Sequence, residues 1–440
     1  MLATSVLFYY SVPGRIQLGG HLADLEEALA MRLLPPRSHM RIVLLVVSLA
    51  ACGTDVSHTN GVVVRDSAGV RIVEIQVAVD TLPHWHVADS ATTTIGVVSG
   101  DPHYELHRVR HTMRLRDGAI AVVNTGSQEV RFYTREGEYQ RSVGGRGQGP
   151  GEFQGLRDVA VTASDTLLVL QGETVARFDG RGTFVSQRTV DVLRFKESTR
   201  EDLGPLWVLP DGSLLFILYQ FANPTAAPTI GPFRPPTGYA RISVEEGHRY
   251  TFGWFPGAEQ FAYESGDLVI GGGMRPLGLD TKIAVGGGKV FIGDNDTYEI
   301  RVYAFEGVLE RLIRLNRDRV GVTSSDVERI RAEWKQVLQQ IPAASRPTIR
   351  RHHSAAPFPE TLPAFADLKA DRDANLWVME YPRNELASHR WVVFDPSGFP
   401  LATVATPAGL RIDDIGSDYV LGLVRDELGV EYVRLYRLTK

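Results

Sequence analysis

Short runs of alternating apolar and polar residues occupy most of the chain from Gly61 onward. Clear examples are GVRIVEI (69–75), AIAVVN (119–124), TLLVL (166–170) and KVFIGD (289–294). The two-residue period and the β-branched residues of these runs predict β-strands. The pattern therefore predicts an all-β chain with many short strands.

One stretch, residues 323–342, has helical spacing instead. Its apolar residues fall at Val327, Ile330, Trp334 and Leu338. Ser324 or Ser325 can cap its start, and Pro342 ends it. We expect one inserted helix over about 323–341.

A strand–turn–strand–strand unit recurs six times. Its turns lie at Asp117, Asp165, Asp211, Gly287, Asp373 and Ser417, with spacings of 48, 46, 76, 86 and 44 residues. Three spacings fit one four-stranded sheet per unit, and the two long ones require insertions. Six such units predict a β-propeller of four-stranded antiparallel blades, whereas a two-sheet sandwich would not need six copies.

Four segments carry a resemblance to a known family. They are VRDSAGVRIVE (64–74), VGGRGQGPGEF (143–153), GDNDTYEIRVY (293–303) and VLGLVRDELGVEYVRLYRL (420–438). With them, residues 61–440 resemble the bacterial six-bladed β-propeller family related to NHL-repeat proteins. The resemblance implies the fold and leaves the function open, because this fold hosts both binding proteins and enzymes.

The glycine-rich stretch VGGRGQGPGEFQ (143–154) could be a phosphate-binding loop or a joint between blades. A dinucleotide loop needs G-x-G-x-x-G, but the sixth position is Pro150 counted from Gly145 and Glu152 counted from Gly147. No G-x-x-x-x-G-K-[ST] occurs, and the stretch precedes a strand rather than a helix. We therefore predict a joint in which Phe153 fills the seam between two blades.

The last unit shows only three strands before the chain stops at Lys440. Its fourth strand must come from elsewhere, because an unpaired edge would open the ring. Surplus strands such as VRIVEI (70–75) and TTTIGV (92–97) lie within 63–97. We predict that one of them pairs with 431–438.

The long segments share one face of the expected ring. Alternating strand directions place segments 219–238, 255–280, 316–363 and 380–390 on the same side, with the helix over the mouth of the central channel. The candidate ligand-binding residues on that side are Arg110, Asp158, Asp280, Asp367 and Asp413 at the mouth, with Tyr381 and Arg383 beside them. The alternative is that these are ordinary solvated charges or salt bridges.

No catalytic set is evident. The histidines at positions 84, 86, 103, 107, 111, 352 and 353 cluster in two places instead of one per blade, which argues against a His-built metal site. DNDTYE (294–299) lacks the glycine and distal glutamate of a calcium loop, and G-x-S-x-G is absent. We expect a binding protein without a cofactor. The alternative, which the resemblance implies, is a lactonase-like or amidating-lyase-like enzyme with calcium or zinc on the axis.

The N-terminal region contains a candidate export signal. MRIVLLVVSLAAC, from Met40, resembles a bacterial lipoprotein signal that ends at Cys52, and its apolar run is too short to span a bilayer. We expect a leader or misassigned start (1–39), a signal peptide (40–51), a tether (52–60) and the propeller (61–440). The true start could be Met31 or Met40, and the alternative for the apolar run is a buried core helix.

This signal predicts a protein lipidated at Cys52 and anchored on the extracytoplasmic side of a cell-envelope membrane, which it contacts through the anchor alone. Cys52 is the only cysteine, so no internal disulfide can form. The formal net charge of −5 gives no basic footprint for nucleic acid. We expect the partner to be an unknown protein or small molecule.

Overall fold

The computed structural model describes residues 9–10, 57–59, 61–221, 230–265, 268–383 and 388–440. Residues 11–56 lie outside this set, so the expected signal peptide and Cys52 fall outside the described residues. A two-residue strand, β1 (Tyr9–Tyr10), pairs with β21 (Leu268–Met274). Among the described residues, no helix is long and apolar enough to cross a membrane.

The six sequence units form six groups of consecutive antiparallel strands, here called blades one to six. Blade one contains β7 (Val109–Arg114), β8 (Ile120–Asn124), β9 (Glu129–Tyr133) and β10 (Tyr139–Gly144). Blade two contains β11 (Leu156–Val161), β12 (Leu167–Gln171), β13 (Thr174–Phe178) and β14 (Phe184–Thr189). Blade three contains β15 (Glu201–Val208), β16 (Leu214–Gln220), β18 (Pro236–Ser243) and β19 (His248–Pro256).

The remaining blades follow the same order. Blade four contains β22 (Thr281–Gly286), β23 (Lys289–Asp294), β24 (Glu299–Ala304) and β25 (Leu309–Leu315). Blade five contains β26 (Asp367–Ala370), β27 (Leu376–Met379), β28 (His389–Phe394) and β29 (Pro400–Thr406). Blade six contains β30 (Arg411–Ile415), β31 (Tyr419–Arg425) and β32 (Glu431–Thr439).

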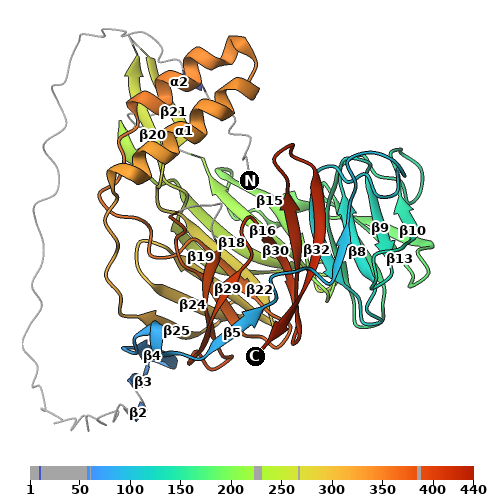
Figure 1. Ribbon diagram of the computed structural model, residues 1–440, viewed down its shortest axis with the longest axis horizontal. Coiled ribbons are helices and arrows are strands. Elements are labelled where there is room, and N and C mark those ends of the chain that lie inside the picture. The colour runs from blue at the N-terminus through green and yellow to red at the C-terminus, as the bar shows by residue number, and fades with distance from the viewer. Residues whose placement is uncertain (1–8, 11–56, 60, 222–229, 266–267, 384–387) are drawn as a thin grey trace, which may run out of the picture.

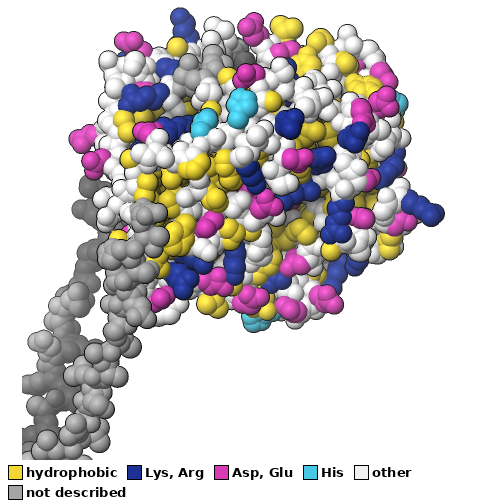
Figure 2. Space-filling view, turned by 60° about the horizontal axis from the view of Figure 1, so that its bottom comes forward, with side chains coloured by type: hydrophobic (Ala, Val, Ile, Leu, Met, Phe, Trp, Pro, Cys, Tyr) yellow, Lys and Arg dark blue, Asp and Glu magenta, His cyan; other side chains and the backbone are white. Residues whose placement is uncertain are grey.

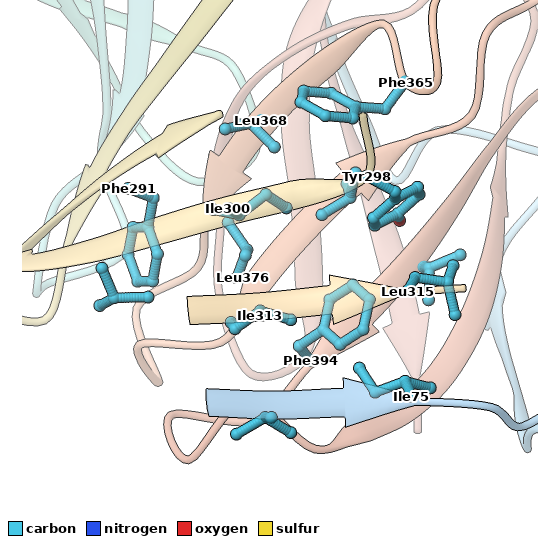
Figure 3. Close-up of a cluster of buried hydrophobic side chains, with 14 of the residues drawn as sticks. Ile75, Phe291, Tyr298, Ile300, Ile313, Leu315, Phe365, Leu368, Leu376 and Phe394 are labelled. Carbon is cyan, nitrogen blue, oxygen red and sulfur yellow. The ribbon is translucent and has the colours of Figure 1, made fainter. Parts of the chain in front are cut away.

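The hydrophobic core is divided among the seams between blades. One buried cluster joins each pair of consecutive blades, and another joins blade six to blade one. Figure 3 shows the seam between blades four and five, where the ring centroids of Tyr298 and Phe394 lie 6.4 Å apart. Six seams for six blades close the ring, so the expected six-bladed β-propeller is confirmed.

The segment that precedes blade one supplies strands to three other blades. β3 (Val62–Ser67) and β4 (Val70–Ile75) form a hairpin that adds to β25 of blade four, with β2 (Ser57–Thr59) beyond it. β5 (His84–Val87) runs parallel to β29 of blade five, and β6 (Thr93–Ile95) pairs antiparallel with β32 of blade six. Strands β2 to β5 lie in the lower part of Figure 1.

The predicted closure is therefore confirmed. Strand β6 lies within TTTIGV and pairs with β32 from Thr93 opposite Leu435 to Ile95 opposite Val433. The other candidate, VRIVEI, is strand β4 and extends blade four instead. Ile95 is 1% exposed and packs in the seam between blades six and one.

The glycine-rich stretch is a joint between blades one and two, as predicted. Phe153 is fully buried in their shared cluster and forms an isolated bridge with Arg146. Gly144 has a positive φ of 91°, and a Cβ there would lie 2.1 Å from the Phe153 ring. Glycine is required at this position because the backbone must turn inward directly beside that ring.

The insertions of blades three to five assemble on one face. β17 (Gly231–Phe233) pairs with β20 (Gln260–Ser265), which pairs with β21. Two helices, α1 (Ser324–Gln340) and α2 (Arg346–Ala355), lie beside this small sheet at the top of Figure 1. The described residues also form three short 3-10 helices: η1 (Val79–Thr81), η2 (Val192–Phe195) and η3 (Ala343–Ser345).

Contacts join all four long segments, which agrees with the expected shared face. The guanidinium of Arg275 donates to the Pro357 carbonyl at 2.8 Å, and Arg383 lies 3.6 Å from the Asp326 carboxylate in α1. The pairing of β17 with β20 joins the remaining segment, 219–238, to segment 255–280. The insertions are therefore one structural unit built on the propeller.

Three details of the helical insertion differ from expectation. The N-cap of α1 is Thr323 rather than Ser324 or Ser325. The Thr323 hydroxyl accepts from the Asp326 backbone N–H, and the Asp326 carboxylate accepts from the Thr323 backbone N–H. The second helix, α2, was not expected. It packs against α1, with the Trp334 ring 3.8 Å from the His353 ring, so part of the apolar stripe of α1 is covered by α2.

Candidate functional site

Three neighbouring inner strands, β7, β11 and β30, carry a bulge at their second or third residue. The register shifts between Val109 and His111, between Leu156 and Asp158, and between Ile412 and Asp414. A bulge leaves one residue unpaired and re-aims nearby side chains. Arg110 and Asp413 are such extra residues, and Asp158 directly follows one.

The Asp413 carboxylate is held by charge and hydrogen bonds. It accepts from Nε and Nη2 of Arg411, both at 2.9 Å, and from the Thr112 hydroxyl at 3.1 Å. Arg411 also donates to the backbone carbonyls of Val109 and Arg110. Asp413 therefore belongs to a polar clamp between blades six and one.

His111 and Asp158 form an incompletely bonded pair beside this clamp. The His111 Nε2 lies 3.3 Å from the Asp413 carbonyl oxygen and donates to it, because a carbonyl can only accept. The His111 Nδ1 is buried, has no hydrogen-bond partner among the described residues, and lies 3.8 Å from Asp158 Oδ1. The other Asp158 oxygen accepts from the Val208 N–H of blade three at 3.0 Å.

The environment of Asp158 favours its neutral form. Burial raises the pKa of its carboxyl to about 6, although the nearby His111 and Arg110 oppose this shift. A protonated Asp158 would also be a donor facing the bare His111 Nδ1. The pair is therefore suited to hold one proton between blades one and two.

The five expected mouth residues divide into two groups. Arg110, Asp158 and Asp413 come together with His111 and Arg411 where blades one, two and six meet, and we call this group the axial cluster. Asp280 pairs with Lys282 at 2.7 Å, and Asp367 pairs with Lys369 at 3.5 Å within its own strand. No contact joins Asp280 or Asp367 to the axial cluster among the interactions of the described side chains.

Tyr381 and Arg383 line a cavity of about 210 Å³ on the face that carries the insertions. Its walls come from the start and end of the link between blades four and five and from the loop after β27. The lining residues include Arg317, Arg319, Leu362, Pro363 and Glu380. Arg317 and Glu380 form an ion pair of 2.6 Å, and Arg319 binds the Asp296 carboxylate at 2.6 Å.

Tyr298 also lines this cavity. It sits at one end of the seam between blades four and five, with its ring 5.6 Å from that of Phe365 (Figure 3). The side chain is 6% exposed, and the hydroxyl has no hydrogen-bond partner among the described residues. Burial raises the pKa of this hydroxyl, and the Glu380 charge adds to the effect.

The sequence patterns did not identify several of these residues as candidate site residues. Tyr298, Arg317 and Glu380 were not proposed, and His111 was considered only as a metal ligand. Among the described residues, no group of three or more His, Cys, Asp or Glu side chains is placed to hold a metal ion. On the face shown in Figure 2, positive and negative side chains are interspersed, with hydrophobic ones between them.

Comparisons with known proteins concern the fold. Residues 105–224 match a family model described as a 6-bladed beta-propeller. No curated protein matches the chain. Similar solved structures include a member of the DUF4221 family from Bacteroides vulgatus, at 9% identity and a TM-score of 0.47, which covers 80% of this chain and 98% of that one.

Two further solved structures show the same range of similarity. A protein described as exported, from Bacteroides fragilis, is 10% identical, covers 82% of this chain and 100% of that one, and has a TM-score of 0.40. A gluconolactonase from Xanthomonas campestris is 12% identical, covers 80% and 99%, and has a TM-score of 0.31. Similarity at this level indicates nothing about activity. The protein is a six-bladed β-propeller.

Proposed function

We propose that the protein binds a small polar molecule in the cavity lined by Tyr298, Arg317, Glu380, Tyr381 and Arg383. The observation that carries this proposal is the Tyr298 hydroxyl, which lines the cavity buried and without a hydrogen-bond partner among the described residues. An unsatisfied buried polar group costs about 1–3 kcal/mol. A ligand that bonds to it recovers part of this cost, so the group favours an occupied cavity.

The size and chemistry of the cavity restrict the ligand. Its volume of about 210 Å³ is below the 300–1,000 Å³ that is typical of drug-sized sites. Its polar lining residues are two tyrosines, three arginines and two acids, while Leu362 and Pro363 supply apolar wall. We infer a small ligand with a hydrogen-bonding group near Tyr298 and a second polar group near Arg317.

The substitution Tyr298→Phe tests this proposal. Binding is first sought by thermal shift with a panel of amino acids, sugars, dicarboxylates and nucleosides. Removal of the hydroxyl is expected to weaken a bound member about 5- to 30-fold, which corresponds to a hydrogen bond worth about 1–2 kcal/mol. The unliganded protein should be as stable as the parent or more stable, because the hydroxyl bonds to no described residue.

The control is Tyr250→Phe, since the Tyr250 hydroxyl bonds to the exposed Glu246 in blade three. It should leave ligand affinity unchanged. Equal affinity of the parent and the Tyr298→Phe variant for every ligand found would refute the proposed site. Stoichiometric calcium or zinc in the purified protein would favour the enzymatic alternative instead.

We also propose that the protein is a cell-envelope lipoprotein, anchored through Cys52. The support is the sequence MRIVLLVVSLAAC from Met40 to Cys52, in which Leu49-Ala50-Ala51 precedes the cysteine. A lipid on Cys52 would leave the propeller on the extracytoplasmic side. The binding face would then be exposed to molecules in the envelope.

Anchoring predicts a clear change in cell fractionation. Cys52→Ser removes the only thiol that can be lipidated, so most of the protein should move from the membrane fraction to the soluble fraction. Cys52→Ser is compared with Ser57→Ala, which leaves the cysteine in place. The lipoprotein proposal fails if the Cys52→Ser variant sediments with membranes as fully as the parent.

A further inference from the structure

The two helices of the insertion enclose a groove that the proposed ligand site does not use. Its volume is about 950 Å³, and its lining residues on α1 fall between Arg331 and Gln339, and on α2 between Arg346 and Ala355. Trp334 forms its floor, with its ring 3.8 Å from that of His353 and 6.0 Å from that of Phe358. The groove therefore combines an aromatic floor with two helical walls.

The rim of this groove is positively charged. Four lining residues are Arg331, Lys335, Arg346 and Arg350, and none is Asp or Glu. Arg346 donates to the carbonyls of Gln339 and Ile341, which fixes the turn between the helices. No ion pair joins Lys335 or Arg350 to another described residue. This local excess stands out in a chain whose net charge is −5.

The shape of the groove fits an extended or helical segment. The lining positions of α1 are spaced three or four residues apart, so they lie on one side of the helix over about two turns. Two turns correspond to about 11 Å. This length matches about three extended residues of a bound chain, with flanking residues over the rim.

The placement of the apolar residues argues against a membrane as the occupant. Membrane-binding helices present protruding apolar side chains. Trp334 and Leu338 are only half-exposed, and none of the groove residues is among the exposed large hydrophobic side chains of the described chain. The apolar surface is recessed between charged rims, which suits a side chain inserted from a partner.

We propose that this groove binds an acidic segment of a partner protein that carries at least one large apolar residue. The apolar side chain contacts Trp334 and Phe358, while flanking carboxylates pair with Lys335, Arg350 and Arg331. Charge-assisted pairs of this kind give orientation and specificity, and the buried anchor gives most of the affinity. This surface is independent of the cavity that contains Tyr298.

A peptide-binding experiment tests the proposal. The purified protein is titrated against a fluorescein-labelled peptide, EEDLEWLDEE, and binding is followed by anisotropy. The charge reversals Lys335→Glu and Arg350→Glu, made together, should weaken binding at least tenfold, and so should Trp334→Ala. A rise in sodium chloride from 50 to 300 mM should also weaken it, because the rim charges are exposed.

Matched controls separate this interaction from general charge attraction. Arg188→Glu reverses an exposed charge on β14 of blade two and should leave affinity unchanged. A peptide with lysine in place of the acids, and one with alanine in place of its leucines and tryptophan, should bind at least tenfold more weakly. Circular dichroism and thermal unfolding check that each variant is folded. If Trp334→Ala unfolds the pair of helices α1 and α2, the charge reversals Lys335→Glu and Arg350→Glu still test the proposal.

Three results would overturn the proposal. One is equal binding of the acidic and basic peptides, or reversals without effect. A second is binding to phosphatidylglycerol vesicles that the reversals abolish while the peptide does not bind, which would identify a membrane surface. The third is self-association that the same reversals abolish, which would identify a second copy of the chain as the occupant.

Discussion

Removal of residues 53–98 is expected to unfold the propeller or to leave it unstable. These residues contain strands β2 to β6, of which β4, β5 and β6 pair with the last strands of blades four, five and six. Val73, Ile75 and Ile95 from this segment are at most 1% exposed. Burial of each large apolar side chain contributes about 1.5–3 kcal/mol, so the segment contributes on the order of 10 kcal/mol. That is comparable to the whole stability of a typical domain.

The measurement is urea unfolding of the chain from residue 53 and of the chain from residue 99. A single substitution isolates the closure itself. Ile95→Ala should lower the free energy of unfolding by about 2–5 kcal/mol, because it leaves a cavity in the seam between blades six and one. Val98→Ala, three residues away and 62% exposed, is the control and should have little effect. A chain from residue 99 that unfolds at the same urea concentration would contradict the closure.

The blades could be predicted from the sequence because each one repeats a local pattern. Alternating residues and tight turns identify the strands one by one, and six copies leave few alternatives to a ring. The seam residue Phe153 was predictable for the same reason, since it follows a glycine-rich turn at a blade boundary. The closing strand followed from the number of strands and the need to cover an edge.

The second helix could not be predicted as the first one was. The sequence of α2, RPTIRRHHSA, has little apolar content to mark a helical face. Tertiary packing supports its helical state: the Trp334 ring of α1 contacts the His353 ring, and Ala355 packs against Phe261 and Tyr263 of β20. Contacts so distant in sequence leave no periodic signal.

The candidate sites show the same limit. His111 and Asp158 occupy ordinary strand positions, and only bulges in different blades bring them within 3.8 Å. Tyr298 is one of fifteen tyrosines. Only the packing of the seam leaves its hydroxyl buried without a hydrogen-bond partner among the described residues. The position of Tyr381 and Arg383 on the face with the insertions was predictable, because they lie in a long loop whose face follows from the alternating strand directions. Contacts between side chains of different blades depend on the folded arrangement, so sequence patterns do not predict them.

Asp158→Asn is expected to stabilise the protein at pH 8 by up to about 3 kcal/mol. Burial raises the pKa of this carboxyl from 3.8 to about 6 in the folded state, and each tenfold change in proton affinity corresponds to about 1.4 kcal/mol. Since the folded state binds the proton more tightly, its contribution to stability is complete below about pH 4 and is lost as pH rises through 6. Asparagine keeps an oxygen to accept from Val208 but carries no charge.

The stabilisation of the Asp158→Asn variant over the parent should therefore be largest at pH 8, shrink as pH falls through 6, and approach zero near pH 4. Urea unfolding of both proteins across this range measures it, and subtracting the two curves removes the titration of all other groups. Asp66→Asn, a change at a side chain that is 57% exposed, should give a flat difference. If Asp158→Asn instead destabilises the protein at pH 8, the carboxylate is ionised and supported by a charged His111. His111 and Asp158 would then form a salt bridge that joins blade one to blade two, rather than a site for a shared proton.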